Sequence, residues 1–154
     1  MAPPEENVVC VNRRARFDYF IEETYEAGLV LQGSEVKSLR AGKANLSDSY
    51  ARIVRGECVL INSHINPYDA ASRFNHEPTR TRKLLLHKQE IRRLAGKTHE
   101  RGLTLVALKL YFKDGMAKVE LGLARGKKLY DKRESIRKKD AQREVERSLR
   151  SRNK

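Results

Sequence analysis

The sequence has few of the residues that build disulfide frameworks, metal centres or membrane spans. Its two cysteines, Cys10 and Cys58, are too few for a disulfide framework, and their spacing matches no zinc motif. No stretch reaches the roughly 18 consecutive apolar residues of a membrane-spanning helix. The first residues have neither the basic nor the apolar region of a secretion signal. We therefore expect a cytoplasmic protein that has no membrane partner and keeps both cysteines as free thiols.

Patterns typical of catalysis are also scarce. The four histidines, His64, His76, His87 and His99, are scattered and form no H-x-E or H-E-x-x-H motif. His64 and His76 could pair as an acid/base couple for RNA cleavage, which keeps an RNA-processing enzyme as an alternative. Lone histidines are more often surface or hydrogen-bonded structural residues. We predict no catalytic residue, no metal and no cofactor.

Positive charge is what the sequence has in excess. The 154 residues carry a net charge of +13, and residues 125–154 hold 13 Lys and Arg against 5 Asp and Glu. The few apolar residues of this tail are widely spaced, so it cannot recover its ordering entropy by packing, and we expect it to be disordered in the free protein. A loose basic arm on a globular body is typical of proteins that bind nucleic acid.

The rest of the chain predicts one mostly β domain. We expect residues 1–7 to be a disordered leader, residues 8–124 the folded domain and residues 125–154 the tail. Strands are predicted at residues 8–11, at 17–32 as two strands, in a hairpin at 49–65 that turns at 55–57, and in a hairpin at 104–124 that turns at 113–115. Helical segments are predicted at 12–16 as a single turn, at 34–42 with Ser34 as the cap, and at 88–100, with a long exposed loop at 67–83. These elements indicate a small antiparallel barrel with two to three helices.

Three consecutive leucines, Leu84 to Leu86, follow a basic stretch. Successive residues of a strand point to opposite faces, so at least one of these leucines must point outward. An exposed leucine beside basic residues can pack on an unstacked base while the cations hold phosphates. A similar combination occurs where Arg13, Arg14 and Arg16 precede Phe17, although most aromatic residues of so small a domain are expected in the core.

Several blocks of residues are similar to one known family. They include NRRA at 12–15, GSEVKSLRAGKANLSDSY at 33–50, PTRTRKLLL at 78–86 and DKR at 131–133. In these blocks, and in their order, the chain resembles the SsrA-binding protein family, also called small protein B, the bacterial partner of tmRNA. The blocks at 33–50 and 78–86 are long enough to make coincidence implausible.

The resemblance implies an oligonucleotide-binding (OB-type) barrel that binds the tRNA-like domain of tmRNA and delivers it to stalled ribosomes in trans-translation. It implies a tail that becomes helical in the empty mRNA channel beyond the decoding centre. The family's RNA-contacting positions correspond to Asn12, Glu26 and Leu85, and those needed on the ribosome correspond to residues 131–133. Tyr130 stands where some relatives have His, and either ring could stack on a decoding-centre base.

The resemblance and the basic clusters together give two predicted sets of site residues. Contacts with the tRNA-like domain are predicted for Asn12, Arg13, Arg14, Glu26, Arg80, Arg82, Lys83 and Leu85. Contacts with the ribosome are predicted for Lys127, Lys128, Tyr130, Asp131, Lys132, Arg133, Arg137, Lys138 and Lys139. The expected partners are tmRNA and the ribosome and, indirectly, the tRNA-carrying elongation factor and alanyl-tRNA synthetase. A generic ribosome-associated RNA-binding barrel is a second alternative.

Overall fold

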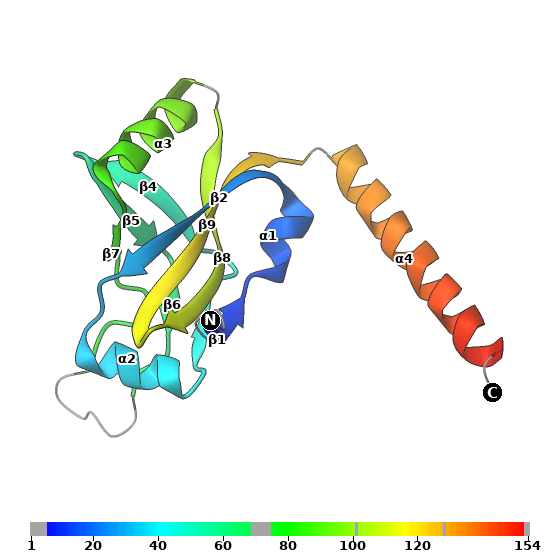
Figure 1. The fold of residues 1–154 in the computed structure, drawn as a ribbon, viewed down its shortest axis with the longest axis horizontal. Helices are drawn as coiled ribbons and strands as arrows, with labels where there is room; N and C mark the ends of the chain where they lie inside the picture. Colours follow the sequence, from blue (N-terminus) through cyan, green and yellow to red (C-terminus); the bar gives the residue numbers. More distant parts are fainter. Residues whose placement is uncertain (1–5, 69–74, 101, 128, 153–154) are drawn as a thin grey trace, which may run out of the picture.

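The computed structural model describes residues 6–68, 75–100, 102–127 and 129–152 (Figure 1). Its strands are β1 (Glu6–Val11), β2 (Tyr19–Leu29), β3 (Ala44–Asn45), β4 (Tyr50–Val54), β5 (Glu57–Ile61), β6 (His64–Ile65), β7 (Arg82–Leu85), β8 (Thr104–Lys113) and β9 (Met116–Gly126). Its helices are α1 (Arg13–Asp18), α2 (Gly33–Arg40), α3 (Lys88–Glu100) and α4 (Leu129–Arg152). None of the helices within these ranges has both the length and the apolar character needed to cross a membrane.

The longer strands pair antiparallel in a ring. From β8 the pairing runs through β4, β5, β7, β2 and β9 and returns to β8. One edge of β8 is shared, because β4 pairs with residues 105–106 and β1 pairs with residues 109–113. Bulges in β1, β2 and β8 bend these strands, which is how a twisted sheet closes on itself. The predicted small antiparallel barrel is confirmed.

Both predicted hairpins are present, and their turns explain why they form. Asp114 and Gly115 have φ of 52° and 77°, and Arg55 and Gly56 have φ of 51° and 76°. Two successive residues with positive φ make the turn whose twist suits a hairpin, and glycine occupies such positions without strain. The turns therefore fix the register of β8 with β9 and of β4 with β5.

The core fills the ring and is closed at both ends by helices. Leu60, Leu105 and Leu121 are buried between the strands. In Figure 1, α2 and α3 lie at opposite ends of the barrel, and their Leu39 and Leu94 are buried in the same core. A second, smaller cluster lies outside the ring, where α1 packs on β8. Apolar residues therefore cover both faces of β8, which explains its nearly continuous apolar sequence.

Some predicted boundaries are wrong. Residues 17–32 do not form two strands: residues 17–18 end α1, a single strand, β2, runs from Tyr19 through Gly28 to Leu29, and residues 30–32 lead into α2. The leader was expected at 1–7, but β1 begins at Glu6, and residues 1–5 lie outside the described residues. The folded domain was expected to end at residue 124, but β9 continues to Gly126. Ser34 does not cap α2: the first turn of that helix is closed by the Gln32 backbone N–H, which donates to the Glu35 carboxylate at 2.8 Å.

The tail is a single helix in this structure, whereas we expected a segment without fixed structure in the free protein. α4 spans 24 residues and projects away from the barrel (Figure 1). Its apolar residues Ile136, Val145 and Leu149 are about half exposed, so the helix buries little. Helical spacing of its charges supplies i, i+4 pairs of about 0.2–0.5 kcal/mol each. That the segment is mainly coil in the free protein stays a prediction.

Candidate nucleic-acid interface

An open groove of about 750 Å³ lies on the surface of the barrel. Its walls come from the end of β2, the end of β7 and the hairpin turn between β8 and β9, with α2 and the start of α3 at its margin. The lining residues used below are Glu26, Gly28, Leu85, His87, Met116 and Lys118. The groove joins segments far apart in the sequence and combines apolar side chains with charged ones, as sites for organic ligands do.

Leu85 is the outward-pointing leucine that the sequence predicts. Along β7, Arg82 and Leu84 are buried while Lys83 and Leu85 are exposed, and Leu85 exposes 55% of its surface. Its pairing partner on β2 is Gly28. A Cβ at Gly28 would lie 3.3 Å from the Leu85 Cβ, so the glycine lets the leucine rest on the β2 backbone. An exposed leucine is thereby held in the wall of the groove.

Glu26 lies in the same groove and is held as a carboxylate. The Tyr111 hydroxyl donates to its Oε2 at 2.5 Å, and the Lys113 ammonium lies 3.4 Å from the same oxygen. The Tyr111 hydrogen bond and the nearby lysine lower the pKa of Glu26 despite the opposing effect of burial. Glu26 therefore presents an ionised acceptor beside exposed Leu85, and two residues 59 positions apart meet in one groove.

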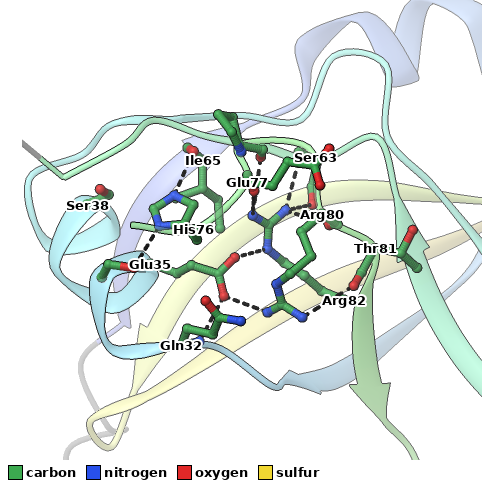
Figure 2. A network of polar contacts seen from close by, with 12 residues as sticks. Gln32, Glu35, Ser38, Ser63, Ile65, His76, Glu77, Arg80, Thr81 and Arg82 are labelled. Carbon is green, nitrogen blue, oxygen red and sulfur yellow. Dashed lines mark hydrogen bonds and ion pairs between the residues drawn. The ribbon is translucent and has the colours of Figure 1, made fainter. Parts of the chain in front are cut away.

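Arg82 does not belong to this surface, and its prediction as an RNA contact is wrong. Its side chain has no exposed area and donates to the Glu35 carboxylate, which is equally buried. It also donates to the backbone carbonyls of Ser63, Arg80 and Pro78 (Figure 2). Instead of contacting a phosphate, Arg82 forms a structural ion pair and hydrogen bonds that join β7 to α2 and to the segment before β7.

The other two basic residues of this stretch are more accessible. Arg80 is 2.6 Å from Glu35 and keeps 30% of its side chain exposed. Lys83 is about half exposed and lies 3.3 Å from Glu57. Exposed ion pairs such as Lys83–Glu57 are weak, so Lys83 can contact a phosphate, and the exposed part of the Arg80 side chain offers a second cation.

The His76 side chain connects α2 with β6. It is buried, with Nε2 2.9 Å from the Ile65 carbonyl and Nδ1 2.9 Å from the Ser34 hydroxyl (Figure 2). Nε2 must donate to the carbonyl, and in the neutral ring Nδ1 then accepts from Ser34. Both nitrogens are engaged and shielded, so this geometry does not suit an acid/base couple with exposed His64. Of the loop predicted at 67–83, residues 69–74 lie outside the described residues, while His76 is buried and β7 already begins at Arg82.

Asn12 is also buried, although it was predicted to contact RNA. Its side-chain NH₂ donates to the carbonyls of Leu46 and Ala107, at 3.0 and 2.9 Å. Its Oδ1 accepts from the Ala15 backbone N–H and so caps α1. Both amide hydrogens are engaged within the protein, which leaves no donor for RNA. The structure gives Asn12 the role of fixing α1 on the barrel.

A second basic region surrounds α1 and the end of β9. The α1 side chains of Arg13, Arg14 and Arg16 are exposed, and Arg14 lies 3.3 Å from Asp18. The first turn of α4 reaches the same helix, since the Lys132 ammonium lies 3.1 Å from Asp18. This region therefore connects the barrel to the tail.

The remaining predicted ribosome contacts lie on or next to α4. Arg133, Arg137, Lys138 and Lys139 are exposed on the helix. Tyr130 and Asp131 belong to its first turn, and Lys128 lies outside the described residues. The predicted residues thus fall into a groove set, a buried set, a set of accessible cations around α1 and β7, and a tail set.

Sequence reasoning missed three exposed or contacting side chains. Phe20 was expected in the core, yet it is 38% exposed beside Arg125 and Lys127. Tyr111 and Met116 were predicted only as parts of the hairpin at 104–124, and no contact was assigned to them. The exposure of Phe20 could have been predicted, because residues 20 and 22 share one face of a strand and residue 22 is a glutamate.

Known proteins resemble this chain over nearly its whole length. An SsrA-binding protein from Desulforudis audaxviator (strain MP104C) is 65% identical over 150 residues, covering 97% of this chain and 98% of the relative. The SsrA-binding proteins of Geobacillus thermodenitrificans (strain NG80-2) and Moorella thermoacetica (strain ATCC 39073 / JCM 9320) are 60% and 63% identical, and they cover 100% and 96% of this chain and 99% and 96% of their own lengths.

A solved structure and a family model agree with these relatives. A chain described under "tmRNA-SmpB: a journey to the center of the bacterial ribosome" is 56% identical and superposes with a TM-score of 0.66, covering 88% of this chain and 96% of that chain. The sequence model of the SmpB protein family matches residues 9–151. Because the match spans the barrel and the tail at such high identity, the chain belongs to the SmpB protein family.

Proposed function

We propose that this protein is an RNA-binding adaptor of ribosome rescue. It binds the tRNA-like domain of tmRNA and delivers that RNA to stalled ribosomes for trans-translation. The proposal rests on the match to SsrA-binding proteins. One of them is 65% identical to this chain, and the match covers the barrel and the tail alike. An adaptor of this kind acts in the cytoplasm, and the elongation factor and alanyl-tRNA synthetase meet it only through the RNA.

The groove supplies the chemistry for binding the tRNA-like domain. A carboxylate repels phosphate, so Glu26 accepts a hydrogen bond from a base edge or a 2′-hydroxyl. Leu85, which lies beside it, packs against an unstacked base. Lys83, which shares a face of β7 with Leu85, contacts phosphates, as do Arg80 just before β7 and Arg13 and Arg14 on α1. The base contacts give specificity, and the phosphate contacts add affinity that depends on salt.

The tail supplies the contact with the ribosome. In this role it lies as a helix in the empty mRNA channel, where its many cations face ribosomal phosphates. Asp131 lies in the first turn of α4, where a carboxylate offsets the positive end of the helix dipole. Lys132 and Arg133 follow it and reach phosphates, with Arg able to bind two phosphate oxygens at once. Tyr130 stacks on a decoding-centre base in the same turn.

The test separates the two activities. Replacing residues 131–133 by Ala in the full chain should leave affinity for the tRNA-like RNA nearly unchanged in a filter-binding assay, because the groove is intact. Tagging of stalled peptides should fall steeply, because the defect comes after RNA binding. Loss of both activities together would contradict the division between barrel and tail.

Groove variants complete the comparison. Glu26→Gln and Leu85→Ala should weaken binding to the tRNA-like RNA by about 1–3 kcal/mol each, the usual value of one base contact. The matched control is Val54→Ala, at an exposed apolar position outside the groove. Equal affinity of all three variants would contradict the groove assignment.

Two alternatives are decided by simple measurements. An RNA-processing enzyme would cleave the tRNA-like RNA during incubation, and His64→Gln would abolish the cleavage. A generic RNA-binding barrel would bind unrelated structured RNA as tightly as the tRNA-like domain under the same salt conditions.

A further inference from the structure

An exposed aromatic ring marks a surface that lies apart from the groove. Phe20 stands at the start of β2 and exposes 38% of its surface. Its partner across the strand pair is Arg125 on β9, so the two side chains lie on the same face of the sheet. An aromatic ring at the surface offers a flat apolar face to a ligand.

Cations surround this ring. The Arg125 guanidinium lies 5.2 Å and the Lys127 ammonium 5.0 Å from the ring centroid. Such distances fit cation–π contacts, which hold the ring and the cations in one cluster. An aromatic ring with adjacent cations is also the arrangement that binds an unpaired nucleotide, since the base stacks on the ring and the cations meet its phosphate.

The place of Phe20 in the fold separates it from the groove. Phe20 and Glu26 are six positions apart on β2, which corresponds to about 20 Å along a strand. One nucleotide cannot contact both. The Lys127 backbone N–H donates to the Asp18 carbonyl at 2.8 Å, so the end of β9 is fixed against α1. Leu129 then begins α4, and in Figure 1 α1 and the start of α4 lie on the same side of the barrel.

We propose that Phe20, together with Arg125 and Lys127, is a stacking site for an unpaired nucleotide of ribosomal RNA. The source is ribosomal because the site is continuous with the tail, and the tail is the part that enters the ribosome in the proposed function, on which this inference rests. The nucleotide stacks on the Phe20 ring, and the exposed arginines of α1 extend the positive surface for the flanking phosphates. The site positions the first residues of the tail, next to the end of β9, as the tail helix enters the mRNA channel.

The absence of tryptophan from the chain gives a direct test. Phe20→Trp places a single indole at the site and keeps an aromatic ring there. Val54→Trp, at an exposed position on the β4–β5 hairpin, is the matched reporter away from it. Fluorescence of each full-length variant is followed while purified small ribosomal subunits are added, and in a second titration while the tRNA-like domain RNA is added.

The proposal expects the Phe20→Trp emission to change about twofold or more with the small subunits, since stacking on a base alters indole fluorescence. It expects no such change with the tRNA-like RNA, and none for Val54→Trp in either titration. An unchanged Phe20→Trp signal with the subunits overturns the proposal. A change that comes with the tRNA-like RNA alone overturns the ribosomal assignment.

A functional comparison separates stacking from local packing. Phe20→Leu keeps an apolar side chain against Arg125 and removes the ring, so thermal stability and binding of the tRNA-like RNA should stay close to those of the unmodified protein. Affinity for the small subunit should fall about tenfold, because the stacking of one base on the ring is lost, and Phe20→Trp should restore it. Unchanged affinity of Phe20→Leu overturns the site. Failure of the unmodified protein to bind the subunits contradicts the proposed function itself.

Discussion

Replacement of Glu35 by Gln tests the buried ion pair that joins α2 to β7. The Glu35 carboxylate is fully buried and accepts from Arg82 at 2.5 Å and from Arg80 at 2.6 Å. Glutamine has nearly the same volume, so the change removes the charge without opening a cavity. Arg82, with no exposed area, then keeps its charge without this counterion.

The expected magnitude follows from the burial of both partners. Removing one member of a buried ion pair costs about 3–5 kcal/mol, largely because the other charge is left unpaired. Arg82 keeps its hydrogen bonds to backbone carbonyls, so we expect the lower end, about 3 kcal/mol. For a domain of this size, roughly 3 °C per kcal/mol gives a decrease in Tm of about 10 °C.

The effect depends on pH in a direction set by the pKa of Glu35. Burial raises this pKa, but hydrogen bonds from Arg80, the Gln32 backbone and Arg82 outweigh it, so the pKa lies below its usual value of 4.5. A carboxyl with a lowered folded-state pKa stabilises the protein above the unfolded-state value, and this stabilisation is lost as the pH falls through the folded-state value. The difference between wild type and Glu35→Gln should be full at neutral pH and smaller in acid.

Urea unfolding followed by circular dichroism measures both quantities, at about pH 7 and about pH 3. Arg80→Gln is the control: it removes one partner of the buried Glu35 carboxylate but leaves the Glu35–Arg82 pair, so a smaller loss of about 1–2 kcal/mol is expected. A loss for Glu35→Gln no larger than that of the control would refute the reasoning. An equal loss at both pH values would show that the charge of Glu35 is not its cause.

Three further changes test other parts of the structure. Gly122→Ala should destabilise the barrel by about 1–3 kcal/mol in the same unfolding assay, because its Cβ would lie 3.0 Å from a buried Leu108 methyl carbon. Tyr111→Phe should raise the pKa of Glu26 toward its ordinary value in an NMR titration, since the Tyr111 hydroxyl is the main cause of the lowered value. Asp18→Asn should lower the stability of the barrel by less than about 1 kcal/mol in the unfolding assay, because its ion pairs with Arg14 and Lys132 are partly exposed.

Much of the barrel could be predicted from local signals. The Asp114–Gly115 and Arg55–Gly56 turns are specified by two residues each, and α3 by the spacing of its apolar residues. The ring itself could not be predicted locally, because the shared edge of β8 joins strands distant in the sequence. Its closure depends on bulges, which leave no clear trace in composition.

A site residue could be predicted where its residue type and the alternation of faces along its strand gave the same exposure. Leu85 is exposed because three leucines in a row cannot all face inward. Arg82 was misassigned because arginine is rarely fully buried, although the same alternation places it on the face of Leu84. Asn12 could have been recognised as a helix cap from its place before a helical turn. The contact between Glu26 and Tyr111 depends on distant pairing and had no such signal.

The length of α4 has a consequence for how far the protein can search for its target. As a helix its 24 residues span about 36 Å. The same residues as an extended chain reach up to about 80 Å. A tail that is coil before contact therefore samples a much larger volume than the helix occupies. Each turn of helix that forms after the first contact shortens the connection and draws the barrel, with its bound RNA, toward the surface that the tail has found.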